Sequence, residues 1–233
     1  MTPPVFHRVT TLDLRVQPRA WPFAQARRAE IDAHFAAEQR KTPELWNGRV
    51  LIGHTPVFDG DRFSADYFET DFASFLAWRD WGFPDKDVFN GFGMGALLSN
   101  DGAFALGEMG HHTSNAGRIY FPSGTPDLDD VRGDRLDIEG SVAREVEEET
   151  GLTAADYVAE PHWDCVFTGV AMAMIRILRV DMTGEALRER IEANLAYEAQ
   201  PELSGIHLVR GTGDLSPAMP RFVTAYLERQ FGG

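Results

Sequence analysis

The sequence predicts an α+β fold: an α/β/α sandwich with a mixed sheet, preceded by an N-terminal αβ extension. Strand-like and helix-like segments follow one another without the regular alternation of a doubly wound sheet. The chain has 233 residues, 43% of them hydrophobic, which is enough for a core in one large domain or two small ones. We expect an extension over residues 1–88 and a domain over residues 89–233, with the boundary near Pro84 to Val88.

The extension is expected to contain both strands and helices. A strand is predicted over Phe6–Val16, followed by a helix from about Trp21 to Gln39 that ends before Pro43. Two strands are predicted within residues 44–68, and residues 71–83 have the pattern of a short amphipathic helix.

The second region begins with a strand pair and ends with a helix. A loop is expected over residues 110–118, a short strand over 119–121 and a long loop rich in Gly, Pro and Asp over 121–134. The remaining predicted elements are a strand pair over 90–109, a helix over 138–150, a strand pair over 166–180, a helix over 184–197, a strand over 205–209 and a helix over 220–231.

Composition excludes several classes of function. A net charge of −14 and a pI near 4.8 disfavour nucleic-acid binding, because a long anionic polymer would be repelled. The single cysteine, Cys165, excludes an intramolecular disulfide, and the chain lacks the Cys/His clusters of structural zinc sites. Neither a signal peptide nor an apolar stretch of about 18 residues is visible, so we expect a soluble cytoplasmic protein without a membrane partner.

The helix predicted over residues 138–150 carries an unusual group of acids. Asp137 is a candidate N-cap and Gly151 a candidate C′ residue. At 100° per residue, Glu145, Glu148 and Glu149 share one arc of about 100°. Such acids disfavour one another's ionised forms unless a cation lies between them, and Mg²⁺ prefers oxygen ligands. The alternative is an acidic helix face that is merely solvated.

The segment REVEEETGL, residues 144–152, resembles the second half of the Nudix box of the MutT-like Nudix hydrolases. The resemblance implies a Nudix-type fold with a loop-helix-loop at the site. It implies that Glu145, Glu148 and Glu149 are catalytic residues and metal ligands, with Arg144 as their organiser and Mg²⁺, or alternatively Mn²⁺, as cofactor. The implied reaction is hydrolysis of the pyrophosphate bond in a nucleoside diphosphate linked to another moiety.

The first half of the box departs from the family pattern. Counted back from Arg144, the family's glutamate position is occupied by Leu136. The segment FPSG, residues 121–124, resembles the family's strand-end proline and glycines, which makes Gly124 a candidate substrate-binding residue behind a loop six residues longer than usual. The loop residues Asp129, Asp130, Asp134 and Asp137 are candidates for a replacement carboxylate, and for Asp137 the favoured alternative is a plain helix cap.

Other candidates lie outside the box. By resemblance, the loop that carries His111 and His112 faces the site, which makes His111 a candidate substrate contact, and Arg118 and Arg176 are candidate phosphate ligands. Many Nudix enzymes have an additional carboxylate after the next helix; Glu198 and Glu202 lie there, and Glu198 is favoured. The glycines of GFGMG, residues 91–95, are not followed by a helix start, so they do not predict a phosphate-binding loop.

The substrate class is a weaker inference. Residues 44–68 and 72–82 look similar to the region before the box in UDP-sugar hydrolases, and FPSG also fits a coenzyme A diphosphatase branch. We expect a small-molecule nucleoside diphosphate derivative as substrate, and a homodimer formed through the N-terminal segment is a further expectation. The alternative function is a catalytically weak Nudix-fold protein that binds a nucleotide and regulates another process.

Overall fold

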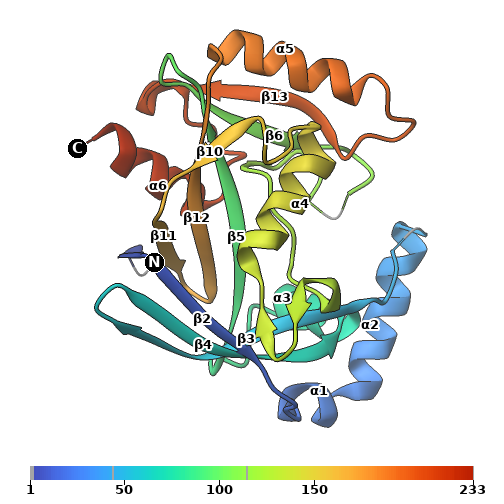
Figure 1. The fold of residues 1–233 in the computed structure, drawn as a ribbon. Helices are drawn as coiled ribbons and strands as arrows, with labels where there is room; N and C mark the ends of the chain where they lie inside the picture. Colours follow the sequence, from blue (N-terminus) through green and yellow to red (C-terminus); the bar gives the residue numbers. More distant parts are fainter. Residues whose placement is uncertain (1–2, 44, 114, 233) are drawn as a thin grey trace. The chain divides into compact units, whose positions relative to one another are not determined.

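The computed structural model describes residues 3–43, 45–113 and 115–232 (Figure 1). The chain divides into two compact units. Unit 1 contains residues 1–10, 92–124 and 138–233, and unit 2 contains residues 11–91 and 125–137. Residues 1–10, which the sequence pattern assigns to the N-terminal extension, thus lie in unit 1, and residues 125–137 lie in unit 2.

Unit 1 is built on a predominantly antiparallel set of strands. β11 pairs with β1 and β12, and β12 also pairs with β10 and β5. β5 pairs with β6, which in turn pairs with β13 and β7. The strands are β1 (Val5–Val9), β5 (Val88–Leu98, of which residues 92–98 belong here), β6 (Phe104–Met109), β7 (Ile119–Tyr120), β10 (Tyr157–Ala159), β11 (Trp163–Thr168), β12 (Ala171–Val180) and β13 (Leu203–Val209).

Two helices cover opposite faces of this sheet, as the sandwich prediction requires. A Cβ at Gly93 or at Gly95 of β5 would lie within 3 Å of valine side chains of α4 (Ile138–Thr150). Phe92, which points to the other face because strand residues alternate, has a ring contact with Phe222 of α6 (Arg221–Phe231). The sheet of unit 1 therefore lies between α4 and α6. α5 (Gly184–Leu195) and a 3₁₀ turn, η2 (Thr212–Asp214), complete the unit.

Unit 2 contains a mixed sheet. β4 (Arg62–Asp71) pairs parallel with β2 (Thr11–Val16) and antiparallel with β3 (Arg49–Asp59). The first residues of β5 pair with β3, and β2 pairs with β9 (Arg135–Leu136). The sequence predicts an irregular loop over 121–134, but the second part of that segment holds the 3₁₀ turn η1 (Leu128–Asp130) and β8 (Val131–Arg132), which forms a hairpin with β9.

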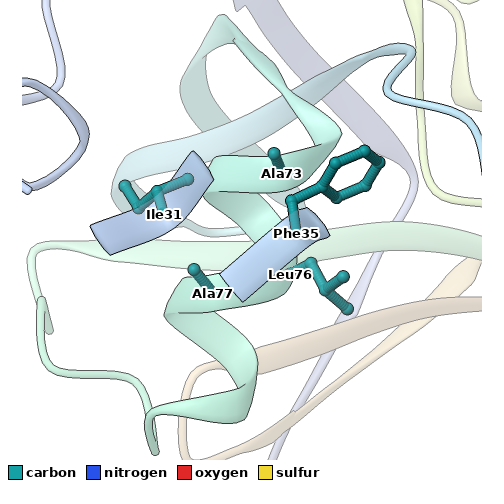
Figure 2. Close-up of a cluster of buried hydrophobic side chains, with 5 residues drawn as sticks. All are labelled: Ile31, Phe35, Ala73, Leu76 and Ala77. Atoms are coloured by element: carbon teal, nitrogen blue, oxygen red, sulfur yellow. The ribbon is translucent and has the colours of Figure 1, made fainter. Parts of the chain in front are cut away.

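The helices of unit 2 are α1 (Pro22–Ala26), α2 (Arg28–Lys41) and α3 (Phe72–Asp80). α2 and α3 pack through the apolar residues drawn in Figure 2, which are Ile31, Phe35, Ala73, Leu76 and Ala77. Asp71 is the N-cap of α3, and its side chain accepts a hydrogen bond from the Ser74 amide. No helix in the described ranges is long and apolar enough to cross a bilayer.

Two predicted elements are each divided in the structure. The strand expected over Phe6–Val16 is interrupted at Thr10, because β1 pairs in unit 1 and β2 pairs in unit 2. The helix expected from Trp21 is interrupted at Arg27, where φ is −117° and ψ is 22°. The sequence pattern does not predict the short strands β8, β9 and β10, whereas the other strands and the helices occur where the pattern places them, apart from the two interruptions and small shifts at their ends.

Candidate active site

Helix α4 begins and ends where the sequence predicts. It spans Ile138–Thr150, and Gly151 follows with a φ of +70° and donates its N–H to the Glu147 carbonyl over 2.8 Å. An L side chain rarely adopts this φ, which explains the glycine. A loop follows the helix at residues 151–153, but the segment before it contains η1 and the β8–β9 hairpin, so the loop expected on that side is present only in part.

The three glutamates of interest differ in burial. Glu145 is 9% exposed and Glu149 only 2% exposed, whereas the Glu148 side chain is 57% exposed. Two of the three carboxylates are thus withdrawn from water. Burial of a carboxylate is unfavourable unless it is paired, so this is not a merely solvated acidic face. The exposed residue Glu147 lies outside the group, as the helical period requires.

Arg144 links two of the acids. Its Nη1 atom lies 2.8 Å from Glu145 Oε1 and 3.3 Å from Glu148 Oε2. The Glu148 contact is the predicted pair one helical turn apart. Arg144 therefore neutralises part of the negative charge and holds both carboxylates toward the same guanidinium.

The turn after β7 lies against the carboxylates of Glu149 and Glu145. The backbone N–H of Ser123 donates to Glu149 Oε1 over 3.2 Å. A Cβ at Gly124 would lie 2.3 Å from Glu145 Oε1, so any larger residue would displace that carboxylate. The Glu145 carboxylate thus occupies the space that a side chain at position 124 would fill. A role of Gly124 in substrate binding stays a prediction.

Glu149 carries the strongest electrostatic perturbation. Its second oxygen, Oε2, has no hydrogen-bond partner within the described residues. Burial raises the pKa of Glu149 well above its ordinary value, and the charges of Glu145, Glu202 and Glu148 raise it further, while the Ser123 hydrogen bond opposes the shift. A cation would stabilise a buried carboxylate that has acidic neighbours and one oxygen unbonded among the described residues.

Two further residues belong to this group. Tyr120 is 8% exposed and its pKa is raised, first by burial and then by the charge of Glu149, with smaller contributions from Glu202 and Glu145. Desolvation and the charge of Glu148 raise the pKa of Glu202, and His112 opposes this. The sequence favours Glu198 over Glu202 as the additional carboxylate. It does not predict a role for Tyr120, since no local pattern marks a tyrosine in a strand as part of a site.

The remaining candidates have other surroundings. His111 and Arg118 are exposed in the segment between β6 and β7, and within the described residues neither has a hydrogen bond or ion pair with the helix glutamates. Arg176 donates to the Glu160 carbonyl, pairs with Glu139 and lies over the Trp163 ring. Arg176 is therefore already engaged in contacts within the sheet and with the first turn of α4. Glu198 accepts a hydrogen bond from Asn194.

The proposed replacements for the absent box glutamate lie in unit 2. Leu136, at the family's glutamate position, is 6% exposed and belongs to β9. Asp130 is buried, and its carboxylate accepts a hydrogen bond from the Asp127 N–H in the cap of η1. Asp130 thus has a structural partner in its own unit, and a metal role for these aspartates stays a prediction.

The donor set of unit 1 fits a hard divalent cation. In the described part of the chain, no three His, Cys, Asp or Glu side chains stand close enough to hold a metal ion together as they are placed. However, Glu145 and Glu149 are buried, Glu149 Oε2 has no hydrogen-bond partner among the described residues, and the exposed Glu148 forms an i,i+4 pair with Arg144. Carboxylate oxygens are among the ligands that Mg²⁺ and Mn²⁺ prefer.

Neither a model of a known protein family nor the sequence of a curated protein matches this chain. Among solved structures, three that resemble it each cover 60% of the chain. The first is the Nudix hydrolase RenU from M. smegmatis, with 13% sequence identity, 81% of that chain covered and a TM-score of 0.39. The second is the MutT protein from Methanosarcina mazei Go1, with 18% identity, 91% of that chain covered and a TM-score of 0.35. The third is a chain of the complex between the C-terminal domain of mouse MUTYH and human PCNA, with 13% identity, 88% of that chain covered and a TM-score of 0.35. With TM-scores below 0.5, these likenesses identify neither activity nor substrate.

Proposed function

We propose that this protein is a magnesium-dependent hydrolase of the pyrophosphate bond in a nucleoside diphosphate linked to another moiety. The observation that carries the proposal is the carboxylate group of α4, in which Glu149 is buried with an unbonded oxygen beside Glu145. A divalent ion would stabilise such a group and would bring the phosphate oxygens of a substrate to the same place.

The residues have distinct roles in this proposal. Glu145, Glu148 and Glu149 would hold the ion, and Arg144 would orient Glu145 and Glu148 through the contacts described above. The chemistry that magnesium supplies when bound is neutralisation of charge on the pyrophosphate and acidification of water. Glu145 or Glu149 would accept the proton of the attacking water as general base.

The substrate class is proposed in order of preference. A UDP-sugar comes first and coenzyme A second, because of the sequence resemblances over residues 44–82 and 121–124. In both cases the partner is a small molecule, which accords with a net charge of −14 that would repel a long anionic polymer.

The test is turnover of a substrate panel by wild type, Glu148→Gln and Glu147→Gln. The panel contains UDP-glucose, ADP-ribose, coenzyme A, NADH and nucleoside triphosphates with magnesium. We expect one substrate to be hydrolysed, a loss of roughly 10²- to 10⁴-fold in Glu148→Gln, and little change in Glu147→Gln, whose exposed side chain lies outside the acidic group. Equal loss in both variants would contradict the assignment of Glu148.

A second candidate is a catalytically weak protein that binds a nucleotide and regulates another process. The observation that favours it is Leu136, an apolar buried residue where the family has a box glutamate. This candidate predicts binding of one panel compound without magnesium-dependent turnover, so the same panel, read by calorimetry, separates the two functions.

A further inference from the structure

We propose that the hydroxyl group of Tyr120 is a substrate-binding group of this site, which donates a hydrogen bond to a phosphate oxygen of the pyrophosphate. The inference rests on the proposed function and deepens it, because it names a neutral donor among the acidic residues. It follows from the position of the phenol, from the group that bonds it, and from the unbonded oxygen of Glu149.

Tyr120 is fixed from both sides along the chain. Its backbone pairs with Gly107 of β6, and the turn that follows it holds Glu149 through the Ser123 amide and encloses Glu145 at Gly124. The charges of Glu149 and Glu145 both raise the pKa of the Tyr120 phenol. The ring is thus built into the frame that places the acids.

The hydrogen bonds around the hydroxyl leave its proton available. Asn115 Nδ2 donates to the phenol oxygen over 3.2 Å, so the oxygen acts as acceptor on that side. Glu149 Oε2 has no partner within the described residues, which means that the phenol proton is not donated to it. Asn115 is exposed, so the hydroxyl of the buried tyrosine is bonded to a residue of the surface.

A donor of this type suits the chemistry of the site. A pyrophosphate brought among carboxylates needs hydrogen-bond donors as well as a cation, and only Arg144 supplies positive charge from α4. The phenol stays protonated, because burial and the acidic neighbours raise its pKa above an already high ordinary value. It therefore donates a hydrogen bond at any working pH without adding a charge that must be desolvated.

The experiment compares Tyr120→Phe with Tyr226→Phe. Tyr226 is a matched control, since it lies in the same unit, is fully buried, and has a hydroxyl without a hydrogen bond in the described chain. Binding of methylenediphosphonate with magnesium is measured by calorimetry. We expect Tyr120→Phe to bind at least about 10-fold more weakly than wild type and Tyr226→Phe to bind like wild type, because a hydrogen bond to a charged acceptor is lost in the first case only.

Two further readouts separate a binding role from a structural one. Urea unfolding shows whether Tyr120→Phe keeps its stability, and Asn115→Ala removes the partner while leaving the phenol. On a hydrolysed substrate, Tyr120→Phe should raise KM about 10-fold with kcat nearly unchanged, since the bond is made in both ground state and transition state.

The outcomes are distinct. Weaker binding in Tyr120→Phe, with Asn115→Ala less affected and Tyr226→Phe unchanged, supports the inference. If Tyr120→Phe binds like wild type, or if Asn115→Ala loses as much, the inference is overturned while the proposed function stands. If wild type neither binds the probe with magnesium nor hydrolyses any panel compound, the proposed function fails and takes the inference with it.

Discussion

At the scale of a single residue, Glu149 is bonded at one oxygen and unbonded at the other in the described chain. Its raised pKa has burial as its first cause, so the ionised form is the one that the fold disfavours. The neighbouring acids act in the same direction. A cation would reverse this balance, and without one the charge of Glu149 should destabilise the folded chain.

The first prediction is that Glu149→Gln stabilises the metal-free protein at neutral and alkaline pH. The pKa of Glu149 is higher in the folded chain than in the unfolded chain, so the folded chain binds this proton more tightly. The stability that the bound proton provides is fully present below the ordinary pKa of a carboxyl group. It is lost as pH rises through the raised pKa of Glu149. The glutamine variant cannot ionise, so its stability should exceed that of wild type by about 1–3 kcal/mol at pH 8 and by less at pH 5.

The measurement is urea unfolding in EDTA at both pH values. Glu147→Gln is the control, because its exposed side chain on the same helix gives up one negative charge without leaving a buried site. If the advantage of Glu149→Gln over wild type is the same at pH 5 and pH 8, or if Glu147→Gln shows the same gain at pH 8, the destabilisation does not come from the buried carboxylate.

At the scale of elements, the position of α4 depends on the glycines of β5. A Cβ at Gly95 would lie 2.6 Å from Val146 Cγ2, 2.9 Å from Leu178 Cδ1 and 3.2 Å from Val142 Cγ1. The helix therefore approaches the strand more closely than a side chain would allow. This packing accounts for Gly93 and Gly95 of GFGMG, which form no phosphate loop but let the acidic helix lie directly on the sheet.

The second prediction is that Gly95→Ala destabilises the protein by about 1–3 kcal/mol, since the added methyl group overpacks the contact between helix and strand. Gly213→Ala is the matched control, because a Cβ there meets no atom within 4 Å and should change stability by less than about 0.5 kcal/mol. Chemical denaturation measures both. Adding Val146→Ala to Gly95→Ala should recover part of the loss, and a purely additive double variant would show that the two residues do not compete for space.

The elements that sequence could predict are those whose signals are local. α4 is marked by the acids of one face and by Gly151 at its end, so its limits could be read from neighbouring residues. The interruptions at Thr10 and Arg27 are marked by neither proline nor glycine. The one at Thr10 separates two strands that pair with segments distant in the sequence, which no local pattern shows. Likewise, sequence spacing alone could not show that Glu202 is the residue whose charge raises the pKa of Glu149, and it favoured Glu198 instead.

At the scale of the whole molecule, a net charge of −14 attracts any cation. Such attraction is screened by salt and depends on ionic strength rather than on the identity of the ion. A site built from Glu145, Glu148 and Glu149 would instead bind Mg²⁺ by direct coordination and stabilise the folded state by mass action. The two effects can therefore be separated in one experiment.

The third prediction is that magnesium raises the unfolding temperature of wild type more than sodium chloride does at equal ionic strength. At 100 times the dissociation constant, one bound ion contributes about 2.7 kcal/mol, which corresponds to roughly 5–10 °C for a chain of this size. Glu149→Gln should lose most of this shift, because it removes the buried ligand, and Glu147→Gln should keep it. A sodium chloride series that raises the temperature as much as magnesium would mean that the acidic residues act only through their total charge, and the site on α4 would then hold no specific ion.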